Sequence, residues 1–128
     1  MAELMITLTP EIWHKITSIN RRWNDRIEYQ SDMEHYGKRD YWAIPKDGLG
    51  DCEDFALAKK RALENQGIPS YLATCWVKTG GYHAVLIVRT DQGDYVLDNR
   101  YGHVWSWNDL PYRWDKMQAE DGHWYAVL

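Results

Sequence analysis

A chain of 128 residues, of which 45% are hydrophobic and 27% charged, has the size and composition of one globular domain, so we expect residues 1–128 to form a single unit. The net charge of −4, with lysine and arginine scattered along the chain, argues against nucleic acid as a partner. The first residues lack a basic start and a long apolar run, and no stretch approaches the roughly 18 apolar residues of a membrane span. We therefore expect a cytoplasmic protein, without membrane contact, that is exported only if a leader has been removed.

Two residue types are used unusually. The cysteines Cys52 and Cys75 lie in an acidic segment and in the apolar stretch YLATCWV, which does not suit a disulfide framework and indicates a reducing compartment. The chain also holds eight Trp and nine Tyr against one Phe. Such side chains suit a small core, and they equally suit a groove that grips an extended peptide or a sugar.

The first predicted element is an amphipathic helix from Thr9 to about Tyr29. Apolar residues recur there at steps of three and four, Thr9 can cap the helix, and Pro10 fits its first turn. Residues 30–50 break that rhythm with three glycines and a proline. They predict a long irregular connection, a kind of segment that often carries function.

A second helix is predicted from Asp51, as N-cap, to Gln66, with Gly67 as its stop and Cys52 in its first turn. Three short segments rich in β-branched and aromatic residues follow and predict an antiparallel meander, and the last six residues predict an edge strand; these segments are 70–78, 82–89, 94–98 and 123–128. Helices followed by an antiparallel sheet make an α+β domain.

Three residues form a candidate catalytic set. A cysteine at a helix N-terminus has its thiolate stabilised by the helix dipole, which makes Cys52 a candidate nucleophile. His83 begins one predicted strand, and Asp98 ends the next. If the hairpin between them turns near Gly93, both lie at the same end of the sheet, where His83 can act as base and Asp98 as its orienter.

These residues resemble a known family. The stretches DYWAIP, GDCEDFALAK, ENQGIP, HAVLIV and VLDN are similar to those of bacterial transglutaminase-like cysteine proteinases, which include the LapG-type periplasmic proteases that cleave biofilm adhesins. The resemblance implies a papain-like or transglutaminase-like core and a cysteine peptidase that hydrolyses a protein substrate through a Cys52, His83 and Asp98 triad. The lack of an export signal departs from the family and is consistent with a bacterial or phage gene product acting on another substrate.

The resemblance also implies calcium. In LapG-type proteases the acids that flank the cysteine bind this ion, and the matching residues are Asp51 and Glu53. Calcium takes six to eight oxygen ligands, so other donors are needed, and Asp40 is our preferred third ligand over Asp32 and Asp47. The alternative is that the acids only complement the helix dipole. No histidine or cysteine spacing suits zinc.

Other interpretations remain open at this stage. His83 is equally compatible with a buried core histidine, and Asp98 with a simple strand end. The same triad could transfer an acyl group to an amine, as transglutaminases do, or act as an amidase. A further alternative is a non-catalytic module in which Trp105 and Trp107 help to bind a peptide or glycan.

Overall fold

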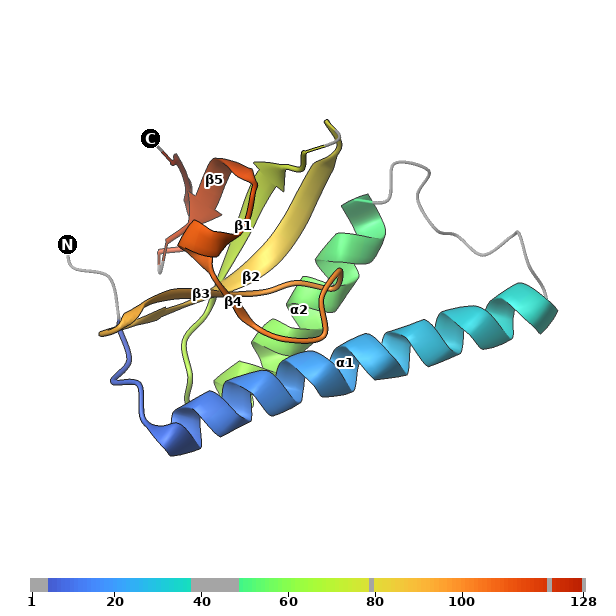
Figure 1. Ribbon diagram of the computed structural model, residues 1–128, viewed down its shortest axis with the longest axis horizontal. Coiled ribbons are helices and arrows are strands. Elements are labelled where there is room, and N and C mark those ends of the chain that lie inside the picture. Colours follow the sequence, from blue (N-terminus) through green and yellow to red (C-terminus); the bar gives the residue numbers. More distant parts are fainter. Residues whose placement is uncertain (1–4, 38–48, 79, 120, 128) are drawn as a thin grey trace.

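The chain folds into two helices packed on one face of a six-stranded antiparallel sheet (Figure 1). The computed structural model describes residues 5–37, 49–78, 80–119 and 121–127, and it describes the side chains of these residues except those of 26–53. In Figure 1 helix α1 runs along the lower edge of the molecule, α2 crosses it, and the strands stand on the other side of α2. The expected α+β class with a transglutaminase-like core is confirmed.

Helix α1 spans Pro10–Gly37 and begins as predicted. The hydroxyl of Thr9 accepts a hydrogen bond from the main-chain N–H of Ile12 at 3.1 Å, which is the expected N-cap. The predicted end near Tyr29 is wrong, because the helix continues for two more turns through QSDMEHY, a run without glycine or proline. The first part of the predicted 30–50 connection is therefore helical, and residues 38–48 lie outside the described ones. Neither helix, over its described residues, is apolar enough at sufficient length to cross a membrane.

Helix α2 spans Leu49–Asn65, so it starts two residues before the predicted cap, and Asp51 lies inside the first turn. Its end is as predicted. Gly67 has a φ of 77°, a left-handed conformation that glycine adopts without steric cost. The N–H groups of Gly67 and Ile68 bond to the carbonyls of Glu64 and Leu63, at 3.0 and 2.9 Å, and close a Schellman motif.

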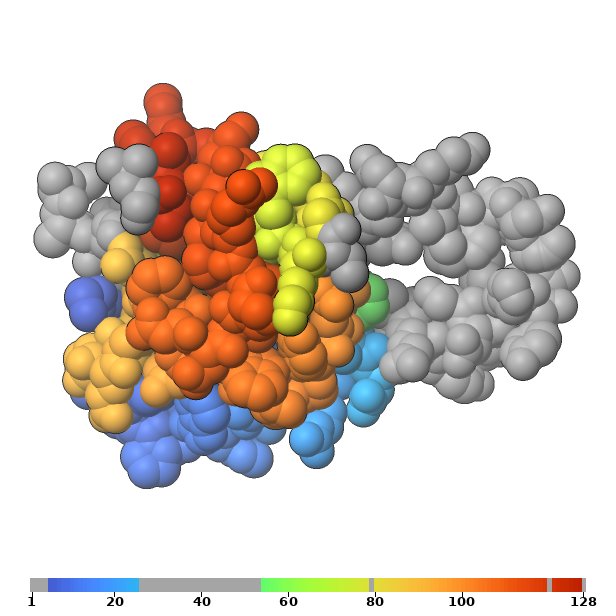
Figure 2. Space-filling model, turned by 45° about the horizontal axis from the view of Figure 1, so that its top comes forward, coloured from blue at the N-terminus to red at the C-terminus, as the bar shows by residue number. Residues whose placement is uncertain are grey.

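The predicted meander is confirmed as β1 (Tyr71–Trp76), β2 (Tyr82–Thr90) and β3 (Gly93–Leu97). The chain then adds β4 (Trp105–Ser106), a short 3-10 helix (Trp107–Asp109), β5 (Arg113–Gln118) and the predicted edge strand β6 (Trp124–Ala126). The strand order is β4-β3-β2-β1-β5-β6, and the paired strands are antiparallel. Figure 2 shows the face on which the residues from β3 to β5, in orange to red, lie above α1 in blue.

The core is divided between the two faces of this sheet. The side chains of strand β2 alternate between the two faces of the sheet, and the strand is buried nearly throughout because both faces are covered. One cluster packs the helices on the sheet: Ile16, Ile19, Ala56, Leu63, Ile68, Leu86, Val88, Leu97 and Val104. The other lies on the opposite face: Ala73, Cys75, Val85, Ile87, Val96, Leu110 and Tyr112. The segment after β3 begins with Asp98 and contributes residues to both clusters.

Candidate active site

Helix α2 places Cys52 in its first turn, where unpaired main-chain N–H groups and the helix dipole favour an anion. A shift of the helix start from residue 51 to residue 49 leaves this placement unchanged. The side chains of Cys52, Asp51 and Glu53 are not among those the structure describes, and all of Asp40 lies outside the described residues. The predicted calcium ligands therefore stay a prediction.

His83 and Asp98 meet at one end of the sheet. In the β2–β3 hairpin Thr90 pairs with Gly93 and Leu86 with Leu97, where the ladder ends, so His83 and Asp98 both lie just beyond its last pair. The turn is thus centred between residues 91 and 92 rather than on Gly93. Nε2 of His83 lies 2.7 Å from Oδ1 of Asp98, with 6% and 0% of their side chains exposed.

This bond fixes the state of the imidazole. An ionised carboxylate can only accept, so Nε2 of His83 carries the hydrogen and donates it to Asp98. In the neutral ring Nδ1 then carries the lone pair, which is the group that a general base needs. A buried histidine in this tautomer, held by a carboxylate, has the base and orienter geometry of the triad enzymes.

Both carboxylate oxygens of Asp98 and its main-chain carbonyl accept hydrogen bonds from residues that the sequence did not indicate. Its Oδ2 accepts a hydrogen bond from the hydroxyl of Tyr112, and its Oδ1 a second one from the main-chain N–H of Arg100 at 3.0 Å. Its main-chain carbonyl accepts from the amide of Asn24, on α1, at 3.1 Å. Of these residues, only Asn24 could have been recognised from the sequence, because it is a polar residue on the buried side of an amphipathic helix.

The electrostatics keep Asp98 ionised. Burial alone would raise the pKa of this carboxyl, but the hydrogen bond and charge of His83, with the bonds from Tyr112 and Arg100, hold the pKa below its ordinary value. Burial and the same carboxylate raise the pKa of Tyr112 far above its ordinary value. Tyr112 is therefore a permanent donor, and Asp98 a permanent acceptor, at physiological pH.

A row of aromatic rings leads away from this pair. The ring of Tyr112 meets His83 edge-on with centroids 5.9 Å apart, Trp114 lies 5.8 Å further, and Trp107 lies 6.4 Å beyond that. Trp107 is 37% exposed, so the row reaches the surface. Trp105 instead packs on Tyr101, its ring partly buried.

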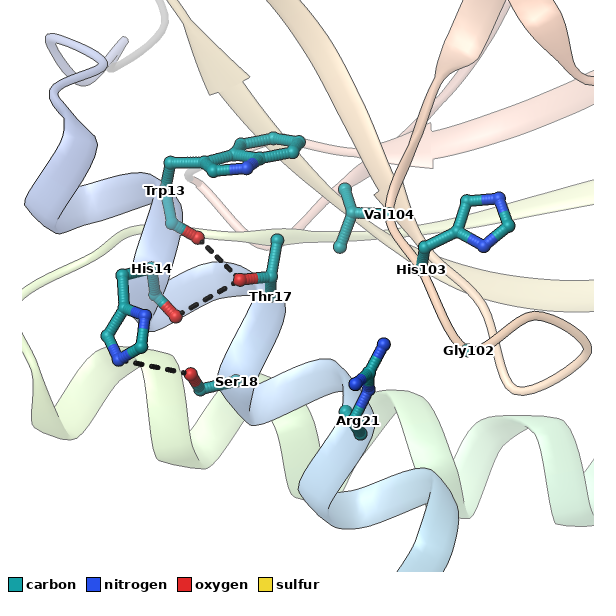
Figure 3. A pocket seen from close by; sticks show the side chains of 8 residues that line it. All are labelled: Trp13, His14, Thr17, Ser18, Arg21, Gly102, His103 and Val104. Atoms are coloured by element: carbon teal, nitrogen blue, oxygen red, sulfur yellow. Dashed lines mark hydrogen bonds between the residues drawn. The ribbon is translucent and has the colours of Figure 1, made fainter.

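Two of the clefts on the α1 side of the molecule are lined by the segment that follows Asp98. One, of about 300 Å³, is lined by Asn24 of α1, Phe55 of α2, and Asn99 with its neighbours in the 100–102 segment. The other, of about 400 Å³, lies between α1 and residues 102–104 (Figure 3).

The larger cleft has no catalytic arrangement. Figure 3 shows that the hydroxyl of Thr17 bonds to the carbonyls of its own helix at Trp13 and His14, and that Ser18 lies 3.5 Å from the His14 ring. The side chain of His103 stands on the opposite wall. Among the described residues, no group of three or more potential metal ligands comes together.

The second cysteine lies close to the same histidine. Cys75 pairs with His83 across β1 and β2, and it is fully buried in the second core cluster. It stands in the middle of a strand, without a helix end to stabilise a thiolate. Its surroundings favour a structural role.

Comparisons with known proteins show the family of the chain. The bacterial transglutaminase-like cysteine proteinase family (BTLCP) matches residues 1–128, and the chain belongs to this family. No curated protein sequence matches it significantly.

Solved structures of Legionella pneumophila LapG share the fold. One is 19% identical with a TM-score of 0.65, covering 94% of this chain and 71% of LapG. Calcium-bound LapG is 15% identical (TM-score 0.64; 88% and 67% covered), and EGTA-treated LapG is 17% identical (TM-score 0.59; 94% and 74% covered).

Proposed function

We propose that the protein is a cysteine peptidase in which Cys52 is the nucleophile, His83 the general base and acid, and Asp98 the residue that orients the imidazole. The substrate is a protein or peptide. The observation that carries the proposal is the buried hydrogen bond between His83 and Asp98 at the sheet end, in a chain whose second helix begins with a cysteine in its first turn.

The chemistry follows from these positions. The proton of the Cys52 thiol passes to Nδ1 of His83, and the thiolate sulfur attacks the carbonyl carbon of the scissile peptide. Main-chain N–H groups at the start of α2 are placed to stabilise the oxyanion. The imidazolium protonates the leaving amine as the C–N bond breaks. Water then gives a proton to His83 and attacks the thioester, which releases the acid and restores the thiol.

Calcium is proposed as a ligand of Asp51 and Glu53, with Asp40 as a third donor. Two carboxylates in one helical turn supply the oxygen donors that this hard cation prefers. When bound, the ion would offset the negative charge beside the thiolate. Support comes from the family and from the calcium-bound LapG neighbour.

The test is labelling with a thiol-directed electrophile at pH 7, followed by mapping of the adduct. We expect labelling at Cys52, at a rate that falls in His83→Ala. The labelling should disappear in Cys52→Ala and persist in the matched control Cys75→Ala. Labelling only at Cys75, or at a rate independent of His83, contradicts the proposal. A peptide library is then profiled with and without calcium. Incorporation of an added primary amine into the peptides separates acyl transfer from hydrolysis.

The calcium proposal has a separate test. Excess chelator should lower both the melting temperature and the rate of Cys52 labelling, and added calcium should restore them. If chelation changes neither quantity, Asp51 and Glu53 serve only the helix dipole.

A second function is favoured by one observation, the aromatic row from Tyr112 to Trp107. Such a row suits binding of an extended peptide without catalysis. If Cys52→Ala keeps the biological effect while Trp107→Ala abolishes it, the protein is a binding module.

A further inference from the structure

The larger cleft, shown in Figure 3, has no part in the proposed mechanism. Its volume of about 400 Å³ lies within the range of about 300–1,000 Å³ that is typical of pockets for small organic molecules. One wall is the side of α1 that carries Trp13, Thr17 and Arg21, which recur at steps of four residues and therefore share one face of the helix. Residues 102–104 form the opposite wall.

One part of this cleft is apolar. The indole of Trp13 is held in place by an edge-on contact with Tyr95, with ring centroids 5.0 Å apart. The hydroxyl of Thr17 is bonded to carbonyls of its own helix, and Figure 3 shows its methyl group directed towards Val104. Val104 is itself buried as part of the core between the helices and the sheet. A ring or a short alkyl chain can therefore be covered here.

The other part of the cleft carries a cation without a counter-ion. Arg21 is exposed, and Figure 3 shows its guanidinium group directed from α1 into the cleft. Over the described part of the chain, no carboxylate lies within ion-pair distance of this group. The next acid along α1, Asp25, lines the smaller cleft instead. None of the described residues that line the larger cleft is acidic, although the chain has a net charge of −4.

These features favour one class of ligand. The guanidinium group presents a planar set of N–H donors that matches two oxygens of a carboxylate or a phosphate at once. Ser18 and His14, whose polar atoms lie 3.5 Å apart, add a hydroxyl and an imidazole to the same cleft. An anion bound beside Arg21 meets no like charge from the described walls, so its attraction to the guanidinium group is not opposed.

We propose that this cleft is a binding site for a small organic anion, in which Arg21 holds a carboxylate or phosphate group while Trp13, Thr17 and Val104 cover the apolar part of the molecule. Carboxylate and phosphate share the oxyanion chemistry that Arg21 recognises, and the probes of the experiment distinguish them. The site goes beyond the proposed peptidase function. Its occupancy is measured without the catalytic reaction, so the two proposals succeed or fail separately.

The experiment is a titration of the full chain with phenyl phosphate, benzoate and the neutral benzyl alcohol, followed by NMR amide spectra and calorimetry. We expect an anion to shift the signals of the cleft residues on α1 and in 102–104, and benzyl alcohol to bind far more weakly. In Arg21→Met the affinity for the anion should fall about tenfold or more, because hydrogen bonds to a charged group are lost. Arg22→Met is the matched control, because Arg22 lines a neighbouring cleft instead, and it should leave the affinity nearly unchanged.

Tighter binding of phenyl phosphate assigns the site to phosphates, and tighter binding of benzoate assigns it to carboxylates; either result upholds the inference. It is overturned if neither anion shifts the cleft signals, if benzyl alcohol binds as tightly as the anions, or if Arg21→Met binds them like the wild type. Should Arg21→Met not fold, added sodium chloride gives the same test in the wild type, because salt screens an exposed cation. Anion binding that does not weaken with salt contradicts the inference.

Discussion

The hydrogen bond from Tyr112 to Asp98 offers a test of how the site is held together. In Tyr112→Phe the ring keeps its edge-on contact with His83, and only the hydroxyl is lost. Oδ2 of a fully buried carboxylate then has no donor, which costs about 1–3 kcal/mol of unfolding free energy. At this chain length that corresponds to a fall in melting temperature of roughly 4–12 °C.

The loss of unfolding free energy in Tyr112→Phe depends on pH in a defined way. The pKa of Asp98 is lowered in the folded protein, so its contribution to stability is present above the unfolded value of 3.8 and disappears as the pH falls through the folded value. Tyr112→Phe weakens this contribution. The variant and the wild type should therefore differ most above pH 5 and converge under more acid conditions.

Tyr125→Phe is the matched control. Its hydroxyl donates to Oδ2 of Asp121 at 2.8 Å in an exposed pair, where water replaces the lost partner. Thermal unfolding followed by circular dichroism at several pH values should show no change for this variant. Equal losses in both variants, or a loss for Tyr112→Phe that does not depend on pH, would refute the reasoning.

Three further substitutions test the fold. Leu63 lies in the core between α2 and the sheet, so Leu63→Ala should lower the free energy of unfolding by about 2–5 kcal/mol, as measured by urea unfolding. Leu57 on the same helix is half-exposed, so Leu57→Ala should lower it far less. Gly67→Ala places a side chain at φ 77° and should lower the free energy of unfolding by about 1 kcal/mol. Gly102→Ala should change it little, because the added Cβ meets no atom within 4 Å. Cys75→Ala should lower the melting temperature slightly and leave labelling of Cys52 intact; a loss of labelling would assign the reactive thiol to Cys75.

Local signals in the sequence were sufficient for most of the secondary structure. Thr9 and Gly67 mark a helix start and a helix end through contacts within a few residues, and segments rich in β-branched and aromatic residues between 70 and 98 predict the three strands. The same hairpin register placed His83 and Asp98 at one end of the sheet. The end of α1 was missed because the polar run after Tyr29 contains no helix-breaking residue until Gly37.

Tertiary structure alone decided what surrounds Asp98. Tyr112 and Asn24 come from two separate segments, and nothing in their local sequence indicates that both bond to Asp98. Periodicity and capping depend on neighbours within about one helical turn or one hairpin, so the sequence determined the start of α1, the end of α2, the meander and the approach of His83 to Asp98. The charges and hydrogen bonds that hold Asp98 ionised depend on the packing of α1, α2 and the sheet, which brings together residues far apart in the chain.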